Sequence, residues 1–133
     1  LRKNFAPYLG NARSGPPVFL TRRGGARIPD NIDTMEAAFQ SNGFEIVDCG
    51  THSVRQQIRK VSSAPAVAGL HGAAMTNLLW APPETPILEI FQPGYLNGCY
   101  EQIALEGGLE YTCLINSGQQ SLDFAVDWIA DIA

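Results

Sequence analysis

The chain has 133 residues, of which 45% are hydrophobic and 17% are charged, and its formal net charge is −4. These values are typical of one globular domain with its own core, and they exclude a disordered chain. The negative charge argues against a general nucleic-acid-binding protein, and no apolar run approaches the about 20 residues of a membrane span.

The first half of the chain alternates strand-like and helix-like segments. In chain order, they are a strand at 18–20, a helix with the apolar stripe Ile32, Met35 and Phe39, a strand at 44–47, and a helix with the stripe Val54, Ile58 and Val61. Asp30 or Asn31 can cap the first helix, and Gly43 suits a left-handed turn at its end. Ser53 followed by Gln56 is a capping box that opens the second helix.

The second half continues the alternation. It has a strand at 66–70, a short helix at 74–79, a strand at 87–91, a helix marked by Leu96, Cys99, Tyr100 and Ile103, a strand at 109–115, and a last helix with the apolar face Leu122, Ala125, Val126 and Ile129. Strands joined by helices predict a parallel sheet covered on both faces. We therefore expect one domain over 1–133 of the α/β class, a doubly wound, three-layer, Rossmann-like fold with strand order 3-2-1-4-5.

Ligands of such folds bind beyond the carboxyl ends of the strands, near the point where the strand order reverses. The loop after the first strand carries Arg22, Arg23 and Arg27 together with two glycines. Arginine binds phosphate oxygens through a planar pair of donors, so this loop is a candidate anion site. The alternative is a basic loop that only faces solvent.

The loop after the third strand reads GLHGAAMTN over residues 69–77. Gly69, Gly72, Ala73 and Ala74 leave the backbone bare, so a ligand can approach closely, and the amide groups at the start of the next helix favour phosphate. His71 can donate to a phosphate oxygen, and Thr76 and Asn77 add short hydrogen-bonding groups. The alternative is that the small residues only permit tight packing and that His71 is a structural histidine.

Glu89 is a carboxylate inside the apolar strand ILEIF, and a buried charge is costly without a partner. It either has a structural role, at an edge or end of the sheet or in a structural pair, or it contacts a ligand hydroxyl or a loop arginine. Asp48, His52 and Ser53 lie where a nucleoside could face them, although the capping role of Ser53 is sufficient by itself.

Motifs of several other classes are absent from the sequence. There is no G-x-G-x-x-G dinucleotide fingerprint, no Walker lysine motif and no G-x-S-x-G hydrolase turn. The three cysteines are odd in number and widely spaced, which predicts neither a zinc site nor a disulfide framework. The two histidines have no metal-like spacing, and we expect neither a metal nor a cofactor.

Three stretches resemble the C-terminal half of the catalytic domain of glycosyltransferase family 61: FLTRRGGARIPDN, SVRQQIRKVSSAPAVAGLHGAAMTNLLWAPPETPILEI and YEQIALEGGLEY. The shared pattern is an arginine pair after a strand, a serine-to-glutamine helix opening, a G-x-H-G-A-x-x-x-N turn, and a strand that contains glutamate. The G-x-H-G-A-x-x-x-N turn is its most specific element.

The resemblance implies a GT-B-type enzyme with two Rossmann-like domains, of which this chain is the half that binds the nucleotide-sugar donor. It implies inverting transfer without an obligatory metal. The residues it assigns to the donor pyrophosphate are Arg22, Arg23, His71, Gly72, Ala73 and Asn77. The other positions that fit the family pattern are Arg27, Asn31, Ser53, Gln57 and Glu89. His71 is the catalytic candidate, and it either holds the leaving group or also transfers a proton.

The expected partners are the nucleotide-sugar donor, a glycan acceptor and a preceding half-domain that carries the acceptor site, because the chain begins with Leu1 rather than methionine. Whether the chain forms a homo-oligomer stays open. Bacterial members of the family are associated with capsular and other surface polysaccharides. The sequence has no leader and no glycosylation sequon, from which we expect a bacterial cytoplasmic or membrane-peripheral protein.

Two other functions remain as alternatives. The first is a non-catalytic nucleotide-binding or interaction module left from a truncated glycosyltransferase. The second is a small flavodoxin-like or regulator-like domain, which the arginines after the first strand disfavour because those proteins carry a phosphate loop or an acidic cluster there.

Overall fold

The computed structural model describes residues 2–24 and 28–132, and its centre is a five-stranded sheet. The strands are β1 (Val18–Thr21), β2 (Glu45–Asp48), β3 (Val67–Leu70), β4 (Pro86–Phe91) and β5 (Glu110–Ile115). All pairings are parallel, and the order is β2-β1-β3-β4-β5. Every residue of β1 and β3 is buried, as expected for strands covered on both faces.

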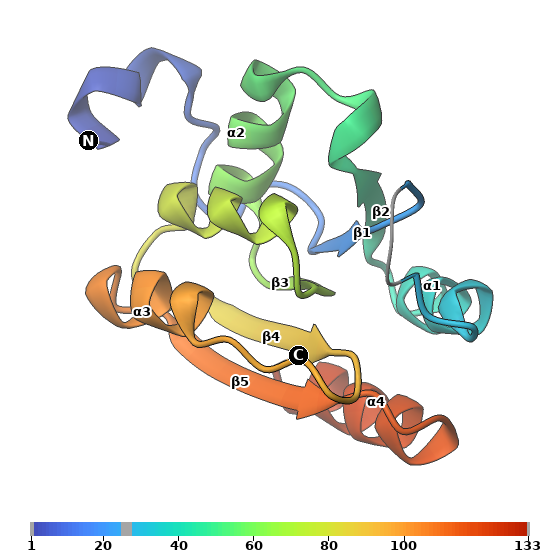
Figure 1. Ribbon diagram of the computed structural model, residues 1–133. Coiled ribbons are helices and arrows are strands. Elements are labelled where there is room, and N and C mark those ends of the chain that lie inside the picture. The colour runs from blue at the N-terminus through green and yellow to red at the C-terminus, as the bar shows by residue number, and fades with distance from the viewer. Residues whose placement is uncertain (1, 25–27, 133) are drawn as a thin grey trace.

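Helices cover both faces of the sheet and give the fold three layers (Figure 1). One face carries α1 (Ile32–Ser41) and α4 (Gln119–Ile132). The other face carries α2 (Val54–Ser63), the 3-10 helix η3 (Ala73–Trp80) and α3 (Cys99–Glu106). Two further 3-10 helices are η1 (Arg2–Tyr8), which lies beside α2, and η2 (Cys49–Thr51), which follows β2. Within the described ranges, no helix combines the length and apolar character needed to cross a membrane.

Each face of the sheet has its own apolar core, because side chains of a strand point alternately to its two faces. Phe19 of β1 packs against Phe39 of α1, with ring centroids 4.5 Å apart. Its neighbours Val18 and Leu20 belong to the core beneath α2 and η3. The predicted α/β class and the doubly wound parallel sheet are therefore confirmed.

The strand order differs in one respect from the expected 3-2-1-4-5. The pairs β1–β2 and β4–β5 were predicted correctly, but β3 lies between β1 and β4 rather than at the edge. The point where the order reverses therefore lies between β1 and β3 instead of between the first and fourth strands. This difference brings the two loops of interest together, because the arginine loop follows β1 and the glycine-histidine loop follows β3.

Local signals at helix ends were correct in part. The capping box of α2 is present, with both Ser53 and Gln56 bonded to each other's backbone, and Gly43 has a φ of +90° after α1. Asn31 occupies the N-cap position of α1, but its side chain does not cap the helix. It pairs instead with Asn116, which follows β5, through a 2.9 Å hydrogen bond from Asn116 Nδ2 to Asn31 Oδ1.

Four apolar assignments were wrong. Val54 opens α2 but is 68% exposed, so it is not part of that helix's buried face, and Cys99 at the start of α3 is exposed as well. Val126 is 41% exposed, and the buried face of α4 consists of Ser121, Leu122, Ala125, Trp128 and Ile129, with Trp128 against the ring of Phe44. Leu96 precedes α3 and is exposed, so it is not part of that helix's apolar face.

Candidate functional site

A pocket with a volume of about 410 Å³ lies at the carboxyl ends of β1, β2 and β3, which is a common size for small-molecule sites. Three loops line it, one after each strand. The lining residues are Thr21, Arg22, Arg23 and Gly24 at and after the end of β1, Asp48, Cys49, Gly50 and Thr51 at and after the end of β2, and Leu70, Gly72, Ala73 and Ala74 at and after the end of β3. The pocket therefore occupies the place that the reversal of strand order predicts for a ligand.

The two arginines that line the pocket differ in their partners. Arg23 forms ion pairs with Asp33 at 2.7 Å and Glu36 at 2.6 Å, both on α1. The hydrogen bond to Glu36 has the largest effect on the pKa of the Arg23 guanidinium, and with the bond to Asp33 it raises that pKa above its usual range. Arg22 forms no ion pair with any described residue. Arg22 is therefore the cation of this loop that is available to a ligand, and Arg27 lies outside the described residues.

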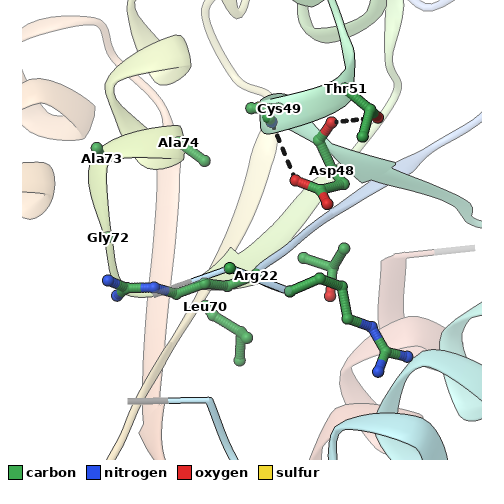
Figure 2. A pocket seen from close by; sticks show the side chains of 12 residues that line it. Arg22, Asp48, Cys49, Thr51, Leu70, Gly72, Ala73 and Ala74 are labelled. Carbon is green, nitrogen blue, oxygen red and sulfur yellow. Dashed lines mark hydrogen bonds between the residues drawn. The ribbon is translucent and has the colours of Figure 1, made fainter. Parts of the chain in front are cut away.

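Gly72 provides the surface against which Arg22 lies (Figure 2). A Cβ atom built at Gly72 would be 3.2 Å from Nη1 of Arg22, and its φ of +158° is one that other residues rarely adopt. The first hydrogen bond of η3 runs from the Met75 N–H to the Gly72 carbonyl. The amides of Ala73 and Ala74 precede that bond, so they lack helical acceptors at a pocket wall where an anion is favoured.

Gly69 has a different reason to be glycine. A Cβ atom there would be 2.7 Å from Sδ of Met75 and 3.1 Å from the Leu20 carbonyl oxygen. The missing side chain lets η3 pack closely on the sheet. The expectation that Gly69 exposes the backbone to a ligand is therefore wrong, because Gly69 serves packing, whereas Gly72, Ala73 and Ala74 line the pocket.

The wall formed by η2 is fixed by a chain of amide side chains. Gln57 of α2 donates from Nε2 to the carbonyls of Cys49, at 3.1 Å, and His52, at 3.0 Å. Asn77 of η3 donates to Gln57 Oε1 at 2.9 Å and to the Ala74 carbonyl at 3.0 Å. Asn77 is buried and does not line the pocket. The structure thus places Asn77 and Gln57 behind the wall, where they join η3, α2 and η2.

Asp48 and Cys49 are the side chains of this wall that can ionise. Asp48 Oδ1 accepts a 3.0 Å hydrogen bond from the Gly50 amide, which holds the carboxylate at the pocket. Burial raises the pKa of the Cys49 thiol, and the charge of Asp48 adds to that effect. Cys49 therefore stays protonated to higher pH than an exposed thiol. Sequence reasoning placed Asp48 near a nucleoside but gave no role to Cys49.

His71 does not line this pocket, although its neighbours Leu70 and Gly72 do. Its ring nitrogen Nδ1 lies 2.6 Å from Oε2 of Glu89. Glu89 has no exposed surface and lies in the middle of β4, between β3 and β5, so the expectation of an edge or end position is wrong. Its partners are His71 and Tyr111 rather than an arginine.

Tyr111 is a residue that sequence reasoning missed. Its hydroxyl donates to the second oxygen of Glu89, Oε1. Burial, and then the hydrogen bond to Glu89, raise the pKa of the Tyr111 hydroxyl far above its usual range, so the hydroxyl keeps its proton. The sequence did hold a signal for this contact, because Tyr111 and Glu89 lie in consecutive predicted strands. In the sheet these strands, β5 and β4, are neighbours, and Tyr111 lies opposite Ile87, two residues before Glu89.

The remaining candidates lie apart from the pocket. Ser53 is engaged in its capping box, with its hydroxyl accepting from the Gln56 amide at 3.2 Å. Among the described residues, no three His, Cys, Asp or Glu side chains come close enough to hold a metal ion. In the part of the chain that the structure describes, the groups of the pocket that suit an anionic ligand and its hydroxyls are thus Arg22, which has no ion pair, the bare amides of Ala73 and Ala74, and the Asp48 carboxylate.

Comparison with known proteins decides the family. Residues 2–88 match the protein family described as Glycosyltransferase 61. The chain belongs to glycosyltransferase family 61. The match includes β1, β2 and β3 with all three loops of the pocket, and it ends one residue before Glu89.

Two plant proteins are also similar to this family 61 chain. It is 37% identical over 59 residues to a beta-1,2-xylosyltransferase of Arabidopsis thaliana, and 36% identical over 59 residues to the beta-1,2-xylosyltransferase RCN11 of Oryza sativa subsp. japonica. Each match covers 44% of this chain and 11% of the relative. The chain thus matches only a small part of these relatives.

Proposed function

We propose that the chain is the donor-binding domain of a glycosyltransferase that transfers a sugar from a nucleotide sugar to a glycan or polysaccharide acceptor. The observation that carries this proposal is the unpaired Arg22 guanidinium, which lies against Gly72 in a pocket where the strand order reverses. A family 61 chain with a cation and free amides at that place is suited to the diphosphate of a nucleotide sugar.

The diphosphate would lie between the loops after β1 and β3. Arg22 would donate to its oxygens from one side, and the amides of Ala73 and Ala74 from the other. As the bond from the sugar to the diphosphate breaks, negative charge grows on the leaving oxygen. Fixed donors aimed at that charge stabilise the transition state without a metal, which fits inverting, metal-independent transfer.

The nucleoside would extend toward β2 and η2. Asp48 ends the strand next to β1 and holds a carboxylate at the pocket, where a ribose hydroxyl could donate to it. An acidic residue at this place binds the ribose in other Rossmann-type folds. The η2 wall, held by Gln57 and Asn77, would then contact the ribose and base.

We propose that the transferred sugar is a pentose. Both named plant relatives are xylosyltransferases, so a xylose-bearing nucleotide sugar is the first donor to test. The acceptor and its site are expected in a second, preceding half of a GT-B-type enzyme.

Isothermal titration calorimetry with nucleoside diphosphates tests the proposal. Arg22→Ala should weaken binding at least about tenfold, because a charge-assisted hydrogen bond contributes about 1.5–3 kcal/mol. The matched control is Arg59→Ala, which removes the same charge from an exposed position of α2 outside the pocket. Its affinity should stay within about twofold of the wild type, since distant surface charges are screened. Equal losses in both variants, or no binding to the folded wild type, would refute the proposal.

A further inference from the structure

Glu89 joins two side chains that come from different strands. It lies in β4 with no exposed surface, opposite Gly69 of β3 and Cys113 of β5. His71 approaches Oε2 from the end of β3, and Tyr111 donates to Oε1 from β5. A carboxylate buried in a sheet is costly unless both oxygens are hydrogen-bonded, and here both are.

The hydrogen bonds define which nitrogen of His71 carries the proton. A carboxylate can only accept, so Nδ1 must be the donor in the 2.6 Å contact with Glu89. In a neutral imidazole the other nitrogen, Nε2, then has the free lone pair and can take a proton. A histidine oriented by a carboxylate in this way acts as a general base in other enzymes.

Aromatic side chains hold the imidazole ring in place. Phe91 stacks on it with ring centroids 4.8 Å apart and an interplanar angle of 23°. Tyr95 and Tyr100 contact it at centroid distances of 5.3 and 5.1 Å. Only 8% of the His71 side chain is exposed. These contacts hold the plane of the ring, as a positioned base requires.

His71 also lies beside the candidate donor pocket. It lines a small second hollow together with Leu70, Ile90, Gln92 and Tyr95, and Leu70 lines both this hollow and the larger pocket. Nε2 of Gln92 is buried and has no hydrogen-bond partner among the described residues. The hollow has a volume of about 10 Å³, so this buried donor suits a single small polar group such as one hydroxyl of a sugar or of its acceptor.

We propose that Tyr111 and Glu89 are positioning residues that hold His71 with its proton on Nδ1, and that Nε2 of His71 is the general base of the transfer. The proposal rests on the glycosyltransferase function proposed above. Nε2 takes the proton of the acceptor hydroxyl as that oxygen bonds to the anomeric carbon. The bond from this carbon to the diphosphate oxygen breaks, and its electron pair leaves with the nucleoside diphosphate. Glu89 stabilises the imidazolium, which later releases its proton to water.

Nitrogen-15 NMR of the histidine side chains of the whole chain tests the arrangement directly. In the wild type, the Nδ1–H tautomer of neutral His71 should exceed the Nε2–H form by at least about tenfold, because a hydrogen bond to a charged acceptor favours it. The double variant Glu89→Leu with Tyr111→Phe removes the Glu89 carboxylate together with the Tyr111 hydroxyl that bonds to it, so neither group is left buried without its partner. This variant should abolish the preference of His71 for the Nδ1–H tautomer. The His52 signals serve as the internal reference.

Tyr111→Phe alone tests the positioning role. The Nδ1 proton of His71 should exchange with solvent about tenfold faster, because Glu89 loses the donor that anchors its other oxygen. Tyr100→Phe is the matched control, since Tyr100 also contacts the imidazole but its hydroxyl bonds to Thr76. It should leave the exchange rate unchanged.

A wild-type His71 that carries its proton on Nε2 would overturn the inference, and so would equal exchange rates in the wild type and Tyr111→Phe. Calorimetry with nucleoside diphosphates separates this failure from failure of the proposed function. Tyr111 lies outside the larger pocket, so Tyr111→Phe should bind a nucleotide with the affinity of the wild type. If the wild type binds no nucleotide, the proposed donor site is refuted, and this result does not depend on which tautomer His71 adopts.

Discussion

The Arg22 guanidinium lies against the backbone of Gly72, so that a Cβ atom at residue 72 would be 3.2 Å from Nη1 of Arg22. The two residues follow different strands, β1 and β3, which are neighbours in the sheet. The absence of a side chain at Gly72 therefore determines where the unpaired cation of the pocket can lie. It also keeps the start of η3 open to a ligand.

Gly72→Ala should weaken binding of a nucleoside diphosphate about tenfold, because the new methyl group displaces Arg22 and the backbone adopts a strained φ. Calorimetry measures the effect. Gly24→Ala is the control, since Gly24 lines the same pocket but a Cβ atom there meets no atom within 4 Å. If the two substitutions change the affinity equally, the contact between Gly72 and Arg22 does not matter for binding.

Gly69→Ala should lower the stability of the fold. The added Cβ atom would lie 2.7 Å from Met75 Sδ and 3.0 Å from Leu20 Cβ, so η3 would have to move away from the sheet. Overpacking of this kind typically costs about 1–3 kcal/mol. Urea unfolding of the variant beside Gly24→Ala measures the difference. A stability equal to that of the control would show that η3 does not depend on this close approach.

Much of the fold could be predicted because its signals are local. The capping box of Ser53 and Gln56 needs only residues three positions apart, and the stripe of Ile32, Met35 and Phe39 needs only the period of one helix. The position of β3 could not be predicted in this way. Alternating strands and helices allow several strand orders, and packing of whole layers selects among them.

The candidate site was harder to predict, because side-chain directions depend on distant partners. Arg22 and Arg23 are adjacent and identical in type, but only Arg23 reaches the carboxylates of α1. His71 was expected beside a phosphate, whereas its ring turns to Glu89 of β4. Asp33 and Glu36 lie three positions apart on a predicted helix, so the sequence indicated that a nearby arginine could pair with them. No sequence pattern indicated the direction of the His71 ring.

Asn77→Ala should destabilise the chain by about 1–3 kcal/mol, because Asn77 is buried and its loss leaves the Oε1 atom of Gln57 without its donor. Nucleotide affinity should fall as well, since the η2 wall is then held less firmly. Urea unfolding and calorimetry measure the two effects. Gln102→Ala removes an amide from the exposed side of α3 and should change the stability by less than about 0.5 kcal/mol. Equal stabilities of the two variants would contradict this account of the wall.

Cys49 should react with iodoacetamide at pH 8 more slowly than Cys99 and Cys113. The thiolate is the reactive form, burial raises the pKa of the Cys49 thiol, and the other two cysteines are exposed. A nucleoside diphosphate should slow Cys49 further because this residue lines the pocket. Peptide mass spectrometry follows each site. Faster labelling of Cys49 than of the exposed cysteines would contradict both its burial and its raised pKa.

The most direct test of the account is amide chemical-shift mapping of the isotope-labelled chain during titration with a nucleoside diphosphate. We expect saturable changes that are largest in the three loops of the pocket, at residues 22–24, 49–51 and 72–74. These changes should be lost in Arg22→Ala but retained in Arg59→Ala. Saturable changes centred elsewhere on the molecule, or no change in these loops when the nucleotide reaches millimolar concentration, would contradict the assignment of this pocket to the donor diphosphate.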